Sequence, residues 1–202
     1  MGAHQPTGKR AVFLDRDGVI NRNVWNPVSG AYEAPLTADQ FELCEGAVSA
    51  MRQLRSAGYE LFLVSNQPNY AKGKASLETL DAIHAKLTAA LAEAEIQLAA
   101  SYYCLHHPEG MIATHSGPCE CRKPSPYFLF KAKEDFGIDL AQSWMVGDRI
   151  SDIECGRAAG TKTAFIREDP FHEAAADLQA RDLLEAVSLI DYAVASVRVS
   201  MV

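Results

Sequence analysis

The sequence has no run of about 18 apolar residues, the length that a membrane-spanning helix requires. Its first ten residues lack the apolar core of an export signal, so we expect a cytoplasmic protein. Positive charge is also scarce: 19 Lys and Arg stand against 26 Asp and Glu, and the formal net charge is −7. A field of that sign repels nucleic acids and anionic membranes. We therefore expect neither as a partner, whereas a small anionic substrate is compatible if its site carries local cations.

Cysteines are few, and their number is odd. The five stand at positions 44, 104, 119, 121 and 155 of a chain without a visible export signal, which argues against a disulfide framework. Three of them cluster between positions 104 and 121, which suggests a metal site. Cys44 and Cys155 belong to no motif, and we expect them to be small buried residues.

Apolar residues make up 48% of the 202 residues and charged residues 22%, which excludes disordered and fibrous classes. We expect one domain over 1–202, with 1–8 as a flexible tail. Short apolar runs that predict strands alternate with segments that predict helices. The alternation predicts an α/β fold with a mostly parallel sheet and helices on both faces. The expected strands are 11–14, 59–64, 100–104, 143–146 and 161–166, and the expected helices are 46–57, 77–96, 126–137, 151–159 and 182–197.

Reactive side chains follow three of the predicted strands, at 15–17, at 65–66 and at 148–152. In an open α/β sheet the ligand crevice lies outside the carboxyl ends of the strands, so we expect these groups to converge. Carboxylates in one crevice repel each other unless a cation intervenes, and oxygen-only ligands favour Mg²⁺. Such a site suits a phosphate group. Alone, the Asp-Arg-Asp-Gly of the first site is equally compatible with a solvated turn.

Four motifs in order carry a resemblance to a known family. They are Phe-Leu-Asp-Arg-Asp-Gly-Val-Ile-Asn at 13–21, Ser-Asn-Gln at 65–67, Arg-Lys-Pro at 122–124 and Val-Gly-Asp-Arg-Ile-Ser-Asp at 146–152. The sequence resembles the haloacid dehalogenase (HAD) superfamily of phosphatases over about residues 11–166. The resemblance implies a three-layer, Rossmann-like fold. The Cys-x-His and Cys-x-Cys pairs before the third motif resemble the zinc-loop branch, which contains heptose bisphosphate phosphatases and histidinol-phosphatases.

The resemblance and the chemistry of phosphoryl transfer suggest a role for each motif. Asp15 would be the nucleophile that forms an aspartyl-phosphate, and Asp17 would protonate the leaving group and then deprotonate water. Ser65 would bind a phosphoryl oxygen and Lys123 would neutralise its charge. The resemblance implies that Asp15, the backbone carbonyl of Asp17 and Asp148 ligate Mg²⁺. By themselves, Ser65 is compatible with a helix cap or a turn, and Lys123 with a surface lysine.

Two further residues of the last motif are expected to support this site. Asp152 suits a helix start, where the positive end of the helix dipole stabilises a carboxylate. We expect it also to hold either Lys123 or the waters of the Mg²⁺ ion. Arg149 directly follows Asp148 and is assigned to the same supporting set.

The segment 104–121 carries four metal donors: Cys104, His106, Cys119 and Cys121. Three thiolates and one imidazole form a closed tetrahedral set, typical of structural Zn²⁺. His107 and His115 are rival nitrogen donors, and the family's Cys-x-His loop favours His106. The intervening residues cannot form a core, so bound metal would explain their order. We expect the zinc loop to brace Arg122 and Lys123 toward the crevice; the alternative is a set of unrelated buried thiols.

The spacing of the motifs leaves no room for a cap domain. We expect an open crevice walled by the loops 23–34 and 66–74 and by the zinc loop. A second phosphate or a carboxylate would bind Arg122, with Lys72 and Lys74 nearby. At 66–73, Asn-Gln-Pro-Asn-Tyr-Ala-Lys-Gly replaces the more usual Asn-Gln-Ser-Gly-Ile-Ala-Arg-Gly, and Pro68 lacks a backbone N–H. The remaining positions that the resemblance assigns to the substrate are Asn23, Val24, Trp25, Asn26, Asn66 and Gln67.

The resemblance implies a Mg²⁺-dependent phosphatase that removes the 7-phosphate of D-glycero-D-manno-heptose 1,7-bisphosphate in surface-polysaccharide synthesis. Histidinol phosphate or another small phosphomonoester is the alternative substrate. An open crevice also admits a phosphoprotein or a nucleic-acid end, although the charge of −7 disfavours the latter. A non-catalytic, zinc-braced binding module is the alternative of a different class. We expect a monomer, with larger assemblies left open.

Overall fold

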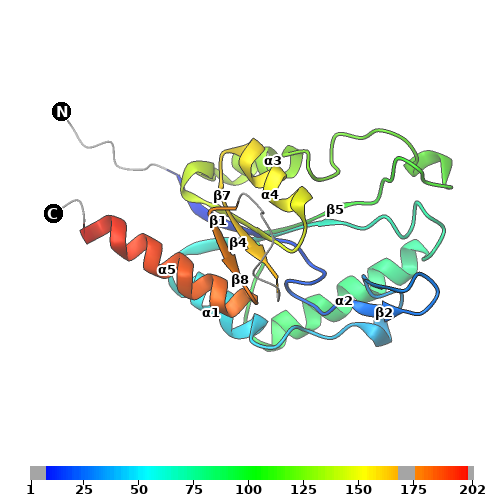
Figure 1. The fold of residues 1–202 in the computed structure, drawn as a ribbon, viewed down its shortest axis with the longest axis horizontal. Helices are drawn as coiled ribbons and strands as arrows, with labels where there is room; N and C mark the ends of the chain where they lie inside the picture. Colours follow the sequence, from blue (N-terminus) through cyan, green and yellow to red (C-terminus); the bar gives the residue numbers. More distant parts are fainter. Residues whose placement is uncertain (1–7, 168–175, 200–202) are drawn as a thin grey trace.

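A computed structural model describes residues 8–167 and 176–199 of the chain (Figure 1). Six strands form one parallel sheet in the order β5-β4-β1-β6-β7-β8. The predicted α/β fold with a mostly parallel sheet is therefore confirmed. The strands are β1 (Arg10–Leu14), β4 (Tyr59–Asn66), β5 (Ala100–Cys104), β6 (Trp144–Gly147), β7 (Lys162–Ile166) and β8 (Leu178–Ala180).

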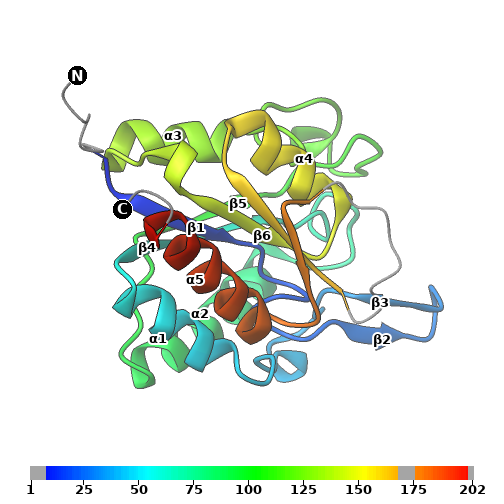
Figure 2. The same ribbon diagram turned by 60° about the vertical axis from the view of Figure 1, so that its left-hand side comes forward.

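Helices cover both faces of this sheet, so the fold has three layers (Figures 1 and 2). Alternate residues of β1 show why the strands are apolar throughout. Val12 and Leu14 are buried with residues of α1, α2 and α5, whereas Ala11 and Phe13 are buried with residues of α3 and α4. The helices are α1 (Ala47–Ser56), α2 (Leu77–Glu93), α3 (Tyr127–Phe136), α4 (Ile150–Ala159) and α5 (Leu183–Val199).

All ten predicted strands and helices are present, with small shifts at their ends. Ser76 caps α2 by accepting a hydrogen bond from the backbone N–H of Thr79 (3.2 Å), but the helix ends at Glu93 rather than near 96. Residues 1–7 of the expected tail lie outside the described residues, as does the segment 168–175, which the sequence predicts to be a loop because it contains Pro170. None of the described helices is long and apolar enough to span a membrane.

The segment 23–34, expected as a loop, is instead an antiparallel hairpin of β2 (Val24–Asn26) and β3 (Ala31–Glu33), which extends away from the sheet (Figure 2). Trp25 faces Tyr32 across the hairpin with ring centroids 5.3 Å apart, a pairing that stabilises adjacent strands. Strands of three residues are too short to show an apolar alternation, so the prediction of a loop was wrong. The short strand β8 was missed for the same reason.

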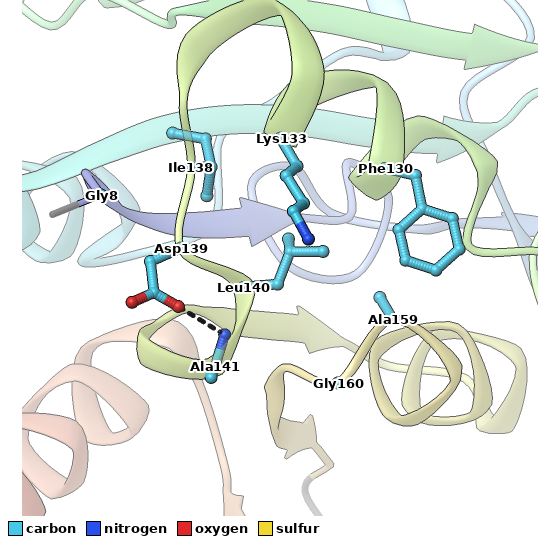
Figure 3. A pocket seen from close by; sticks show the side chains of 9 residues that line it. All are labelled: Gly8, Phe130, Lys133, Ile138, Asp139, Leu140, Ala141, Ala159 and Gly160. Atoms are coloured by element: carbon cyan, nitrogen blue, oxygen red, sulfur yellow. Dashed lines mark hydrogen bonds between the residues drawn. The ribbon is translucent and has the colours of Figure 1, made fainter. Parts of the chain in front are cut away.

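A hollow of about 430 Å³ lies between the last turns of α3 and α4, near the entry to β1 (Figure 3). Lys133, Asp139 and Gly160 are part of its lining, and Asp139 accepts a hydrogen bond from the backbone N–H of Ala141 (3.1 Å). This is the amino-terminal edge of the sheet, where Lys9 bridges to Ile138. The reactive residues lie at the opposite edge, so this hollow is not the candidate site.

Candidate active site

Three carboxylates meet at the carboxyl ends of the central strands. β1 lies between β4 and β6, so Asp15 after β1 and Asp148 after β6 are neighbours. Asp152, in the first turn of α4, joins them, and one oxygen from each of the three lies within 4.8 Å of the others. The convergence of these carboxylates is therefore present, although Asp15 lies more than a hundred positions from the other two.

Two glycines of the motifs make this close approach possible. Gly18 has a positive φ of +83°, and a Cβ atom there would collide with the Asp148 carboxylate. A Cβ atom on Gly147 would collide with the side chain of Asp152. Glycine is thus a steric requirement at both positions, because any side chain would displace a carboxylate of the cluster.

The carboxylates of this cluster are buried and repel one another, so their ionised forms need more positive charge nearby than the cluster itself contains. Burial, then the charges of Asp15 and Asp152, raise the pKa of Asp148 to about 7. Burial also raises the pKa of Asp152 to about 6, although Lys123 opposes the shift. Oδ1 of Asp148 is buried and accepts no hydrogen bond from a described residue. A divalent cation with oxygen ligands fits such a set, and Mg²⁺ is the ion that prefers it.

These pKa values predict how stability depends on pH and Mg²⁺. Both carboxyls have folded pKa values above the unfolded value of 3.8, so the Mg²⁺-free protein loses stability as pH rises from about 4 to 7. For Asp148 the loss is on the order of 3–4 kcal/mol. We expect Mg²⁺ to raise the melting temperature markedly at pH 7.5 and little at pH 5. Thermal unfolding at both pH values checks this, and equal Mg²⁺ effects would contradict it.

Lys123 is not a surface lysine, because its side chain is only 2% exposed. Its Nζ lies 2.9 Å from Oδ1 of Asp15 and 2.7 Å from Oδ1 of Asp152, and it donates to the carbonyl of Val64 (2.7 Å). Burial lowers the pKa of Lys123, but the two carboxylates outweigh burial and raise it overall. The lysine therefore stays charged and compensates part of the cluster.

Asn66 holds the backbone of this lysine. Its Oδ1 accepts from the N–H of Lys123 (3.0 Å), and its Nδ2 donates to the carbonyl of the same residue (3.1 Å). Both hydrogen bonds join the end of β4 to a segment 57 residues away. Asn66 was assigned to the substrate from the sequence; it lines the crevice, but its amide is already engaged by Lys123.

Asp17 stands apart from the three-carboxylate cluster, in a polar network of its own. Arg16 donates to it from Nε (3.1 Å) and Nη2 (3.2 Å), Asn21 donates at 3.0 Å, and Nε2 of Gln67 donates at 2.6 Å. Gln67 also donates to Oγ of Ser65 (3.0 Å). Ser65 lies within β4, so the alternative of a helix cap or a turn residue was wrong. Sequence reasoning gave no role to Arg16, and its place between two aspartates was the available signal.

A cavity of about 220 Å³ opens over Asp15, Asp17, Lys123 and Asp152, and we call it the carboxylate cavity. Two of the three expected walls are present, the hairpin and the segment 66–74, whereas no residue of the zinc loop 104–121 lines the cavity; Arg122, which follows that loop, does. The other lining residues are Glu33, Ala34, Asn66, Pro68, Asn69, Lys72, Lys74, Arg122, Arg149 and Ser151.

The cations around this cavity differ in their partners. Lys74 binds Glu33 of the hairpin at 3.1 and 3.3 Å, which ties the hairpin to the segment 66–74. Arg122 donates to the carbonyl of His106 (3.2 Å). Arg149 caps α4 through its backbone, which donates to Asp152 (3.0 Å), and its Nε lies 3.9 Å from Asp148. Lys72 lines the cavity as a further cation.

The residues expected at the substrate from the segment 23–26 lie around the hairpin. Nδ2 of Asn23 approaches Oδ2 of Asp148 (3.4 Å), and Asn26 donates to Glu33 (3.0 Å). Val24, Trp25 and Asn26 line a separate small hollow of about 80 Å³. Gln67 likewise lies outside the lining of the carboxylate cavity, whereas Pro68 and Arg122 belong to it.

The four predicted zinc donors lie together. One donor atom each from Cys104, His106, Cys119 and Cys121 falls within 4.8 Å of the other three. Three thiols and an imidazole are the donor set of a closed, structural Zn²⁺ site, so these residues fit the ion. His107 and His115 are engaged elsewhere, with the backbone of Glu109 and the hydroxyl of Thr114, which favours His106 as the nitrogen ligand.

The zinc loop is also tied to the segment 66–74. The ring of His115 stacks on that of His106, and the ring of Tyr70 meets His115 edge-on, both with centroids 5.0 Å apart. The backbone N–H of Met111 donates to the carbonyl of Ala71 (2.6 Å). A metal at the four donors would thus brace one wall of the carboxylate cavity.

Replacing Cys119 by serine tests this metal site. We expect bound zinc to fall from about one ion per chain to near zero, and the melting temperature to drop by about 5–10 °C. The matched control is Cys44→Ser, which removes a half-buried thiol outside the cluster. Metal analysis and thermal unfolding measure both effects, and an unchanged zinc content in Cys119→Ser would refute the site.

The two remaining cysteines differ in burial. Cys155 is buried, as expected, and donates to the carbonyl of Ser125 (3.2 Å). Cys44 is only partly buried, at the edge of the core that contains α1 and α5, so full burial was wrong for it.

The fold and the site define a HAD-like phosphatase. A family model described as HAD-hydrolase-like matches residues 120–190. The crystal structure of a D,D-heptose 1,7-bisphosphate phosphatase from B. bronchiseptica, complexed with magnesium and phosphate, superposes with a TM-score of 0.74 at 25% identity. It covers 91% of this chain and 98% of its own.

Two curated relatives show which family of HAD-like phosphatases this chain belongs to. D-glycero-β-D-manno-heptose-1,7-bisphosphate 7-phosphatases from Salmonella typhi and Yersinia pestis are each 38% identical to this chain, over 156 and 172 residues. The alignments cover 77% and 83% of this chain and 79% and 87% of the relatives. The chain belongs to the family of the D-glycero-β-D-manno-heptose-1,7-bisphosphate 7-phosphatases.

Proposed function

We propose that this protein hydrolyses the 7-phosphate of D-glycero-D-manno-heptose 1,7-bisphosphate and leaves the 1-phosphate in place. The observation that carries the proposal is the buried Asp15–Lys123–Asp152 network at the end of the central strand, in a chain of this family. A β anomer is supported by the names of the relatives. The product would serve the synthesis of a surface polysaccharide.

In the proposed reaction, an oxygen of Asp15 attacks phosphorus. A bond forms between Asp15 and the phosphoryl group while the bond from phosphorus to the sugar oxygen breaks, and Asp17 gives that oxygen a proton. Asp17 then takes a proton from water, which attacks the aspartyl-phosphate and releases inorganic phosphate and free Asp15. The hydrogen bonds from Arg16, Asn21 and Gln67 hold Asp17 for both transfers.

The remaining charges would stabilise the transferring group. Lys123 neutralises its oxygens, and Ser65 donates a hydrogen bond to one of them. Asp15, the carbonyl of Asp17 and Asp148 would hold Mg²⁺, and Asp152 would support the site through Lys123. When bound, Mg²⁺ offsets the negative charge of the carboxylates and the phosphoryl group.

The rest of the substrate would lie along the carboxylate cavity. Arg122 and Lys72 are the cations that would bind the second phosphate, because Lys74 is already paired with Glu33. Pro68 offers no N–H there, so Arg122 and Lys72 carry more of the recognition. Arg122 directly follows Cys121, so a metal bound by the four donors of the zinc loop would hold Arg122 in place.

Three further proposals concern the domain organisation, the oligomeric state and the location of the protein. We propose one domain over 1–202, a monomer, and a cytoplasmic location. The six-stranded sheet, whose strands run from β1 near one end of the described chain to β8 near the other, supports the first of these.

Steady-state kinetics on both anomers of the heptose bisphosphate, with histidinol phosphate as the comparison substrate, tests the function. We expect kcat/KM to be highest for the heptose bisphosphate, and ³¹P NMR to show loss of the 7-phosphate with the 1-phosphate retained. If histidinol phosphate is hydrolysed orders of magnitude faster, the proposed substrate is wrong. If neither ester is hydrolysed while zinc and Mg²⁺ bind, the alternative of a non-catalytic binding module is supported.

A further inference from the structure

Arg16 is a buried cation, 1% exposed, in the network of Asp17. Its Nε and Nη2 donate to the two carboxylate oxygens of Asp17, at 3.1 and 3.2 Å. Two hydrogen bonds from one planar guanidinium fix the orientation of a carboxylate as well as its position. Arg16 therefore orients the group that transfers protons in the proposed function, and the placement of Arg16 itself matters for the reaction.

The ring of Tyr103 lies beside this guanidinium. Cζ of Arg16 is 5.8 Å from the ring centroid, within the range of a cation–π contact. The sheet explains this placement: β5 runs parallel to β4 with Tyr103 opposite Ser65, so both side chains lie on the same face. Ser65 accepts from Gln67, which also donates to Asp17. Tyr103 is thus the neighbour of the Asp17 network on the next strand.

His84 of α2 restricts the orientation of the Tyr103 ring. The hydroxyl of Tyr103 lies 2.9 Å from Nδ1 of His84, and the two rings meet edge-on with centroids 5.3 Å apart. A cavity of about 180 Å³ borders the same group, with Arg16, Gln67 and Tyr103 in its lining. Packing around Arg16 is therefore incomplete on one side, and truncating Tyr103 would enlarge the cavity and give the guanidinium room to move.

We propose that Tyr103 is a positioning residue for proton transfer: its ring holds the guanidinium of Arg16, and Arg16 in turn orients the carboxylate of Asp17. The inference rests on the proposed function, in which Asp17 protonates the leaving oxygen. Tyr103 is not among the residues that line the carboxylate cavity, so it acts without touching the substrate. Its removal should change the rate through Asp17 and not through substrate binding.

Two esters of similar shape test this, because they differ in their need for a proton. Benzyl phosphate loses an alkoxide, which takes a proton from Asp17 as its bond to phosphorus breaks, whereas p-nitrophenyl phosphate loses a phenolate that leaves without one. We expect Tyr103→Leu to lower kcat/KM about tenfold for benzyl phosphate and less than about twofold for p-nitrophenyl phosphate. The heptose bisphosphate also loses an alkoxide and should respond as benzyl phosphate does. Tyr103→Phe keeps the ring and should stay within about threefold of wild type on all three.

Tyr102→Leu is the matched control, since it removes a tyrosine ring from the adjacent position of β5. That ring stacks with Phe62 and Phe128 in the core on the other face of the sheet. The control should lower stability but leave the ratio of the two kcat/KM values at its wild-type value. It therefore separates a general loss of packing from an effect on Asp17.

A second measurement does not depend on activity. The Nε–H of Arg16 is buried and hydrogen-bonded, so its ¹⁵N-bound proton should exchange slowly with solvent, and Arg16→Lys assigns the resonance by its loss. In Tyr103→Leu the exchange should be about tenfold faster or more, and in Tyr102→Leu it should be unchanged.

Equal losses on both esters in Tyr103→Leu would overturn the proposal, and so would an unchanged Arg16 resonance in that variant. If the wild type hydrolyses neither ester nor the heptose bisphosphate, the proposed function fails and the catalytic role of Tyr103 fails with it. The resonance then still shows whether Tyr103 holds Arg16. Should Tyr103→Leu fail to fold, Tyr103→Met takes its place with the same expected results.

Discussion

Asp15→Asn is expected to lower kcat by on the order of 10⁴–10⁶-fold while the protein stays folded. The amide keeps the shape of the side chain but cannot form the aspartyl-phosphate. The substitution also removes one of three charges that repel each other, although it weakens the pair with Lys123. Phosphate release and thermal unfolding, measured on the same preparation, separate the chemical effect from the structural one.

Asp39→Asn is the control for this variant, because it makes the same change on a fully exposed side chain. It should retain wild-type kcat and melting temperature. An Asp15→Asn protein with more than about one hundredth of the wild-type kcat would rule out Asp15 as the nucleophile. Loss of the far-UV signal of the fold would instead assign it a structural role.

Lys123→Met is expected to affect both stability and rate. Removing one partner of a buried ion network costs about 3–5 kcal/mol, because Asp15 and Asp152 are left without their compensating charge. Since Mg²⁺ supplies positive charge to the same cluster, the loss of stability should be smaller at saturating Mg²⁺. We expect kcat to fall about 10²–10⁴-fold even then, because the charge on the transferring phosphoryl group is no longer neutralised.

Chemical denaturation with and without Mg²⁺, together with steady-state kinetics, measures these effects. Lys131→Met is the matched control: that lysine is exposed and pairs with Asp135 in the same helix, so stability and rate should stay near wild type. A Lys123→Met protein as stable and as active as Lys131→Met would show that the buried ion network has no role.

The three-carboxylate cluster shows how much of the site can be predicted from local sequence patterns. Each buried strand of a parallel sheet is an apolar run, and a polar residue that ends such a run must lie at the same edge as the others. Asp15 and Asp148 were therefore placed together although they are 133 positions apart. The cluster of predicted zinc donors was found for a simpler reason, since the four residues lie within eighteen positions of one another.

Apart from the pair of Asp152 with Lys123, which was one of two expected roles of Asp152, contacts between side chains of distant segments were not predicted. Sequence patterns report which face a residue occupies, not which partner it meets across the sheet. The pairing of Lys74 with Glu33, the two hydrogen bonds from Asn66 to Lys123 and the network that joins Gln67 to Asp17 each depend on such partners. The hairpin was missed because its strands are too short for a periodic signal.

The sequence by itself determined the class of fold, the edge of the sheet where the reactive side chains meet, and the segment in which the candidate metal donors cluster. Periodicity and motif spacing are local properties, and they suffice for those three. Only the tertiary structure decided which charges are buried, which cations around the carboxylate cavity are already paired, and which amide holds which partner. Those outcomes depend on distances of a few ångströms between segments that the chain keeps far apart, and packing alone sets them.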